Sequence, residues 1–310
     1  MSPLQKSLND YLALRRSLGF KLKREGLWLP TFVRAIGQSK SSFVTSKIAL
    51  KWAQGTKNQP PKSWAKRLRM VRKFAQYVHA RDPRHEVPPL ELAPIARSMR
   101  FEPYIYSDDE VRDLMNKAKK ICQIPFKGET YSTMIGVLAA TGMRVGEVIT
   151  LDRSDFDRRQ GLLQIRKAKF GKSRQIPLHP TTIKALCEYE KIRDRELSRP
   201  RGPAFFLSSK GKRLIYNNFQ FVFHKLVISI GLGRAKPQPP RVHDLRHTFA
   251  VKTITSWYKA GLDTGPRLPA LSTYLGHVCP SSTYTYLHAT PELLQQASRR
   301  LEKSQKGVQS

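Results

Sequence analysis

Apolar residues recur every three to four positions through most of the chain, which is the spacing of one face of an α-helix. Gly19 is a stop signal for the first such segment, and Thr45 is placed to cap the third. The fourth segment has the most regular apolar stripe, which runs from Trp64 to Val78. The helices predicted in the first hundred residues span 4–18, 28–37, 45–54 and 63–80.

A cluster of prolines separates these helices from the rest of the chain. Three prolines lie between residues 88 and 94, and proline holds the chain extended and donates no backbone hydrogen bond. A length of 310 residues also suits two domains of ordinary size. We therefore expect a helical N-terminal domain over 1–87, a linker over 88–103 and a second domain over 104–310.

The second domain is predicted to be mainly helical with one small antiparallel sheet, a fold of the α+β class. Residues 161–166 and 174–178 read as strands joined by a turn around 169–171, and so form a hairpin. Ser107 and Glu110 have the spacing of a capping box, so the acids between them indicate a helix start and not a metal site. Further helices are expected at 110–120, 130–140, 181–195, 216–230, 243–258, 268–275 and 291–304.

Composition adds a polyanionic partner to this picture. The chain holds 56 Lys and Arg against 23 Asp and Glu, a formal net charge of +33. A surplus of this size and sign is typical of proteins that bind nucleic acid. Residues 1–100, with 21 Lys and Arg against 5 Asp and Glu, are the more basic part per residue.

The helix predicted at 63–80 carries five cations and no carboxylate. A solvated surface is the ordinary explanation of a basic helix face, but such faces usually include acidic partners. Contact with the DNA backbone is therefore favoured here. The five residues expected to make it are Lys66, Arg67, Arg69, Arg72 and Lys73.

Other classes of protein fit the sequence poorly. The best apolar run, 134–151, is interrupted by Arg144 and Glu147, so no membrane span is expected. The first residues lack the apolar core of a signal peptide. Three cysteines form no disulfide framework and suit a reducing compartment, so we expect a cytoplasmic, nucleoid-associated protein.

Several polar residues of the second domain have the chemistry needed to cleave a phosphodiester. Two arginines can clamp the non-bridging oxygens, a tyrosine can be the nucleophile, and a lysine or histidine can protonate the leaving oxygen. His243 and His247 could bind zinc only with a third ligand, and Arg246 would repel the metal. Because no Walker loop and no G-x-S-x-G sequence occur, neither ATP-driven chemistry nor serine hydrolysis is expected, and no cofactor or metal is predicted.

These residues lie in segments that resemble the motifs of the tyrosine recombinases, also called phage integrases. ATGMRVGEV at 140–148 resembles the first box, which makes Arg144 the first catalytic arginine and Glu147 its supporting acid. KFGKSR at 169–174 resembles the hairpin box, so the catalytic lysine is Lys169 or, as second choice, Lys172. Lys172 and Arg174 are also expected to contact DNA.

The remaining motifs follow further along the chain. HDLRHTFA at 243–250 resembles the second box and contributes His243 and Arg246, and LGH at 275–277 resembles the third and contributes His277. The nucleophile position of the family falls on Tyr286, which its spacing from His277 favours over Tyr284. The stretch 253–271 is longer than in compact members, as in members associated with transposons and integrons.

The resemblance implies a C-shaped clamp on DNA, with a SAM-like helical core-binding domain and a catalytic domain. It implies cleavage through a 3′-phosphotyrosine, strand exchange through a Holliday junction in a homo-tetramer, and integration, excision or resolution without metal or ATP. It leaves room for an accessory protein or a partner recombinase. Two alternatives stay open: a DNA-binding clamp without catalysis, and a related topoisomerase or telomere resolvase.

Overall fold

The structure is a computed structural model that describes residues 2–39, 41–55, 61–92, 103–121, 124–166, 173–197, 202–233, 239–277 and residue 283. The chain divides into two units, Met1–Phe101 and Glu102–Ser310. The point of division lies inside the segment predicted as a linker. Each unit buries a hydrophobic core of its own. The helix predicted at 291–304 and the turn at 169–171 lie outside the described residues.

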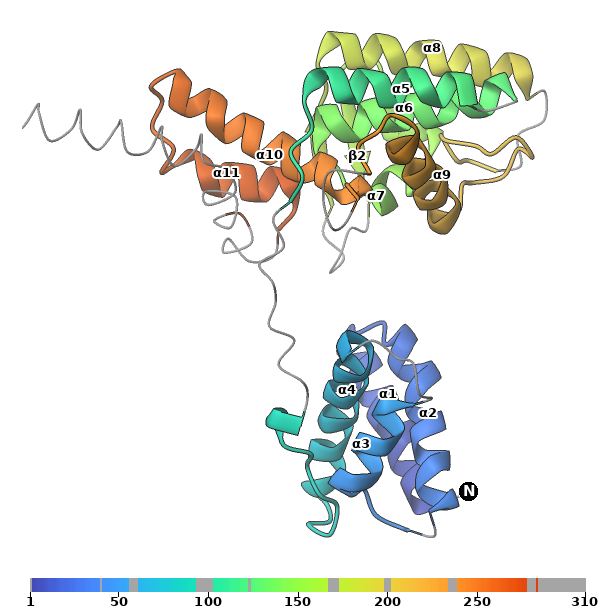
Figure 1. Cartoon of the computed structure of the whole chain (residues 1–310), viewed down its shortest axis with the longest axis vertical. Helices are drawn as coiled ribbons and strands as arrows, with labels where there is room; N and C mark the ends of the chain where they lie inside the picture. The colour runs from blue at the N-terminus through green and yellow to red at the C-terminus, as the bar shows by residue number, and fades with distance from the viewer. Residues whose placement is uncertain are drawn as a thin grey trace, which may run out of the picture. The chain divides into compact units, whose positions relative to one another are not determined.

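The first unit contains the four helices that the apolar pattern predicts. Leu8, Leu29 and Phe74, which come from different helices, are fully buried in its core. The Thr45 hydroxyl accepts a hydrogen bond from the Ile48 amide and so caps the third helix as expected. The elements are α1 (Pro3–Ser17), α2 (Lys23–Gln38), α3 (Ser46–Gln54), α4 (Pro61–His79) and the short 3-10 helix η1 (Leu90–Leu92) (Figure 1). Helix α2 begins earlier than predicted. The apolar pattern missed its first turn because that turn is polar and shows no apolar repeat.

The first unit extends beyond residue 87. The Glu86 amide donates a hydrogen bond to the Val44 carbonyl (2.8 Å), and the Arg72 guanidinium donates one to the Pro88 carbonyl. Leu92 packs against the core of the unit. The beginning of the predicted linker is therefore part of the helical unit.

The cations of α4 divide into two groups. Lys66, Arg69 and Lys73 are exposed, and their spacing of three and four residues places them on one face of the helix. Arg67 and Arg72 are only partly exposed. The Arg67 guanidinium lies 5.0 Å from the ring of Trp28 and 5.7 Å from the ring of Trp52, and the Arg72 guanidinium bonds to the Pro88 carbonyl. Three of the five predicted contact residues thus face solvent together.

The second unit is built around α6 (Pro125–Thr141), which is buried along most of its length. Helices α5 (Asp108–Ile121) and α8 (Pro180–Glu196) pack beside it (Figure 1). The strands β1 (Phe156–Asp157), β2 (Leu162–Ile165) and β3 (Arg174–Pro177) form an antiparallel sheet in that order. The prediction of a mainly helical fold with a small antiparallel sheet is confirmed. The pattern missed β1, because two residues are too few to show an alternation.

Helices α10 (Val242–Lys259) and α11 (Arg267–Leu275) pack against each other through a separate apolar cluster that includes Ile254 and Leu271. Helix α9 (Tyr216–Ser229) precedes them. The predicted capping box is confirmed: the Glu110 amide donates to the Ser107 hydroxyl (3.0 Å), and the Glu110 carboxylate accepts from the Ser107 amide (2.8 Å). Within the described ranges, no helix combines the length and the apolar character that crossing a membrane requires.

The packing of Arg67 generates a test of its role. Arg67→Gln is expected to lower the free energy of unfolding by about 1 kcal/mol, because it removes the packing of the guanidinium on two aromatic rings. Lys66→Gln, one position earlier and exposed, is expected to change it by less than about 0.5 kcal/mol. Urea unfolding followed by tryptophan fluorescence measures both, since three of the four tryptophans, Trp28, Trp52 and Trp64, lie in the first unit. Equal effects would contradict a structural role for Arg67.

Candidate active site

Arg144 emerges from a tight turn between two helices. Helix α6 ends at Gly142, which has φ +60°, and Arg144 is the N-cap of α7 (Val145–Thr150). A Cβ atom on Gly142 would lie 2.5 Å from the ring of Phe249. Both the backbone conformation and the close packing therefore require glycine at this position. The Arg144 side chain is 28% exposed, so it is accessible from solvent.

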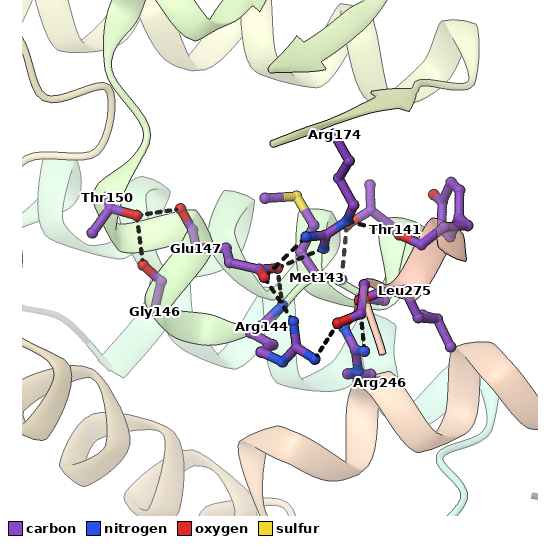
Figure 2. Close-up of polar contacts among 12 residues, drawn as sticks. Thr141, Met143, Arg144, Gly146, Glu147, Thr150, Arg174, Arg246 and Leu275 are labelled. Carbon is purple, nitrogen blue, oxygen red and sulfur yellow. Dashed lines mark hydrogen bonds and ion pairs between the residues drawn. The ribbon is translucent and has the colours of Figure 1, made fainter. Parts of the chain in front are cut away.

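The Glu147 carboxylate holds Arg144 in two ways (Figure 2). It accepts hydrogen bonds from the Arg144 backbone amide (3.0 Å) and from Nη1 of its guanidinium (2.9 Å). The same carboxylate binds Arg174, whose Nη1 and Nη2 lie 3.1 Å and 2.8 Å from its two oxygens. Burial alone would raise the pKa of Glu147, but the hydrogen bonds from Arg174 and Arg144 lower it overall. Glu147 is therefore an ionised, buried link between two arginines.

The C-terminal end of α11 binds three arginines. Its last carbonyl groups have no partner within the helix, and the helix dipole makes this end partly negative. Three consecutive carbonyls each accept a hydrogen bond from a different guanidinium (Figure 2). The pairs are Tyr274 O with Arg174 Nε (2.8 Å), Leu275 O with Arg246 Nη2 (2.7 Å), and Gly276 O with Arg144 Nη2 (2.8 Å).

Arg246 lies deepest among these arginines. Its residue is 2% exposed, and its Nη1 donates to the carbonyl of Gly142, at the end of α6 (2.9 Å). One guanidinium thus joins the C-terminal ends of α6 and α11. These contacts fix the plane of the Arg246 guanidinium beside Arg144.

His243 lies in the first turn of α10, three residues before Arg246. Its ring meets the ring of His247 edge-on, with the centroids 4.9 Å apart. Although the residue reaches the surface, the burial of part of its ring, together with His247 and Arg246, lowers the pKa of His243 to about 4. The imidazole is therefore neutral at pH 7.

His277 follows the α11 cap directly. Its Nδ1 lies 2.7 Å from the hydroxyl of Thr283, a residue that is 1% exposed. Burial, followed by the charges of Arg246 and Arg144, lowers the pKa of His277 to about 4. His243 acts on the same pKa, so four of the predicted residues lie within electrostatic reach of one another.

The structure thus brings Arg144, His243, Arg246 and His277 into one site. Lys169, Lys172, Tyr286 and the competing Tyr284 lie outside the described residues. Arg174 donates hydrogen bonds to Glu147 and to the carbonyl of Tyr274; its expected contact with DNA stays a prediction. Sequence reasoning missed Thr283, because a threonine next to a motif carries no signal that it will meet His277.

The arrangement of charges suits one tetrahedral anion. Two guanidiniums, held from behind by backbone carbonyls and by Glu147, lie beside two neutral imidazoles. Arginine offers a planar set of donors that matches two phosphate oxygens at once. Such fixed donors stabilise charge that develops on a phosphoryl group without having to reorganise during the reaction.

Comparison with known proteins identifies relatives of the whole chain. Residues 105–292 match the phage integrase family. The chain is 38% identical, over 98% of its own length and 98% of the relative's, to a protein of Sinorhizobium fredii named as an integrase/recombinase. It is 28% identical to the tyrosine recombinase XerC of Pelotomaculum thermopropionicum, over 78% of this chain and 76% of that one.

Solved structures share the fold at lower identity. The Tn1549 transposon integrase, solved with a circular intermediate DNA, gives a TM-score of 0.66 at 18% identity, over 95% of this chain and 99% of that one. A lambda integrase dimer bound to a core site gives 0.60 at 18% identity, over 91% and 97%.

The histidine environments generate a prediction about pH. In the free protein, the imidazoles of His243 and His277 should titrate with midpoints near 4, whereas an unfolded histidine titrates near about 6.5. Between these values the unfolded chain takes up protons that the folded chain does not, so stability falls as the pH drops from about 6.5 towards 4. NMR titration of the imidazoles and unfolding at several pH values measure both effects. Midpoints near about 6.5 would contradict the effect assigned to partial burial and to the neighbouring cations.

Proposed function

The chain belongs to the phage integrase family of tyrosine recombinases, and we propose here how its own residues carry out the reaction. It is a site-specific DNA recombinase, an enzyme that cleaves and rejoins DNA strands. The observation that carries the proposal is the pair Arg144 and Arg246, held side by side through the end of α11. The two arginines are proposed to bind the non-bridging oxygens of the scissile phosphate.

Tyr286 is proposed as the nucleophile. Its phenol oxygen forms a bond to phosphorus, the bond from phosphorus to the 5′-oxygen breaks, and a 3′-phosphotyrosine results. Negative charge grows on the phosphoryl oxygens in the transition state, and Arg144 and Arg246 stabilise it. Because the guanidiniums supply this charge, the proposed step needs no metal ion. The bond energy stays in the phosphotyrosine, so rejoining needs no ATP.

The proposed proton transfers begin with a His243 imidazole that carries no proton to spare at pH 7 and so can accept one. His243, neutral at pH 7, accepts the proton of the attacking phenol. His277, whose Nδ1 contacts Thr283, binds the phosphate through its other ring nitrogen. Lys169, or Lys172 as the second choice, donates a proton to the leaving 5′-oxygen.

The stoichiometry of strand exchange supports a tetramer. Recombination between two duplexes cuts four strands, and each subunit supplies one nucleophile. Four copies of this chain meet that count, as do two copies joined by two of a partner recombinase. We propose the homo-tetramer as the assembly on DNA.

The first unit is proposed as the core-binding domain. Lys66, Arg69 and Lys73 form an exposed basic face on α4, which is suited to phosphates along a DNA strand. Contacts of this kind position the protein without reading sequence. Lys172 is proposed as a further backbone contact in the catalytic unit.

A nicked suicide substrate tests the catalytic proposal. The wild-type protein should form a covalent adduct that is seen as a band of reduced mobility in denaturing gels. Tyr286→Phe should abolish the adduct and leave DNA binding near wild type, because only the nucleophilic oxygen is removed. Tyr284→Phe is the matched control and should still form the adduct.

An adduct that survives in Tyr286→Phe would overturn the assignment of the nucleophile. A wild-type protein that binds DNA and never forms an adduct would be a clamp without catalysis. The DNA product distinguishes a recombinase from enzymes with related chemistry. A recombinase exchanges strands between two sites, whereas a topoisomerase yields a relaxed circle and a telomere resolvase yields hairpin ends.

Salt dependence tests the basic face of α4. Replacing Lys66, Arg69 and Lys73 with alanine should weaken binding and should reduce the slope of log K against log salt by about 0.9 for each phosphate that the protein no longer neutralises. A filter-binding series at several salt concentrations measures the slope. The control variant Arg72→Gln, in which the altered side chain is turned towards Pro88, should leave it nearly unchanged. An unchanged slope in the triple variant would exclude this face from DNA binding.

A further inference from the structure

Arg174 is bonded like a structural residue and not like a DNA contact. It is the first residue of β3, and its side chain is only 12% exposed. Each of its three guanidinium nitrogens donates to a partner inside the unit: Nε to the Tyr274 carbonyl, and Nη1 and Nη2 to the two oxygens of Glu147 (Figure 2). All three nitrogens of this guanidinium are thus engaged by partners of the same unit.

The paired contact determines how the Glu147 carboxylate is oriented. An arginine fork on a carboxylate fixes the plane of both groups. That plane decides where the Glu147 oxygens meet the Arg144 backbone amide and its Nη1. The position of Arg144 therefore depends on Arg174, although Arg174 contacts Arg144 only through Glu147.

Charge leads to the same conclusion. Glu147 carries one negative charge, and a single arginine paired with it would be largely neutralised. Because Glu147 pairs with both Arg144 and Arg174, the three groups together keep one net positive charge. Arg144 thus retains cationic character towards a bound anion.

We propose that Arg174 is a positioning residue for DNA cleavage: acting through Glu147, it sets the geometry and the net charge with which Arg144 meets the scissile phosphate. The inference rests on the proposed role of Arg144. Arg174 also joins the start of β3 to the end of α11 through Tyr274. It therefore joins the end of the β2–β3 strand pair where Arg174 lies opposite Ile165 to the arginine site.

The test compares a normal scissile phosphate with a neutral methylphosphonate, in which a methyl group replaces one charged oxygen. Without that charge, the arginine site matters less to cleavage. Arg174→Gln should slow adduct formation on the phosphodiester by about 10- to 100-fold, the scale of a small misplacement of a reacting group. On the methylphosphonate, the difference from wild type should shrink to a few-fold.

Two further variants make the comparison specific. Arg174→Lys keeps the charge but loses the planar fork, so it should recover part of the rate on the phosphodiester. Arg153→Gln is the matched control, because Arg153 pairs with Asp194 at the surface, with each side chain 42% exposed. It should cleave both substrates like wild type. Thermal unfolding of each variant shows whether the fold is kept; if Arg174→Gln does not fold, Arg174→Lys carries the same substrate comparison.

Three outcomes would overturn the inference. Equal slowing of Arg174→Gln on both substrates would mean a general structural defect, and wild-type rates on both would mean no role in cleavage. If Arg174→Gln lowered the slope of log K against log salt by about one and cleaved at the wild-type rate at saturating DNA, Arg174 would be a direct DNA contact. Failure of the proposed function looks different, because the wild-type protein would then form no adduct on the phosphodiester.

Discussion

The carbonyl groups at the end of α11, which have no partner within the helix, are the constraint on which the candidate active site depends. A helix leaves its last carbonyls without partners in its own chain, and here Tyr274, Leu275 and Gly276 find them in three arginines. The arginines come from β3, α10 and the start of α7. The hydrogen bonds that the end of α11 accepts therefore hold three separate segments close together. His277 is the next residue along the chain, and its amide donates back to the carbonyl of Ser272 (2.9 Å). The candidate catalytic residues Arg144, Arg246 and His277 are thus positioned by contacts with one helix terminus.

The sequence was sufficient for the motifs and for the long helices. Arg144 and His277 lie far in the chain from each other and from the pair His243 and Arg246, and only the resemblance to a family joined these residues before the structure did. The short helix α7 escaped the pattern because Val145–Thr150 is too brief to show an apolar repeat. The sequence also could not predict which groups the basic side chains contact. A long basic side chain can reach outward to solvent or back into its own fold, and Arg67 and Arg174 do the latter.

The difference between basic side chains that face solvent and those that bond within the fold changes what the net charge indicates. Part of the surplus is exposed and available to a polyanion, as on the face formed by Lys66, Arg69 and Lys73. Another part is internal and holds the fold together. In the second unit the fully buried Arg193 bonds to Glu190, Asp194 and the carbonyl of Phe205. Net charge counts both kinds alike, so it indicates the class of partner and overstates the area of contact.

The glycine caps at Gly142 and Gly276 have a consequence for the chemistry. Their carbonyls receive Arg246 and Arg144, and a peptide carbonyl has no proton to gain or lose over the physiological range. Glu147 is the one ionisable anchor among these contacts, and its pKa is lowered. The imidazoles of His243 and His277 beside them do change charge with acidity. With pKa values lowered to about 4, the two imidazoles take up protons only in acid. The carbonyl contacts of the arginines do not depend on that change, because a peptide carbonyl does not titrate.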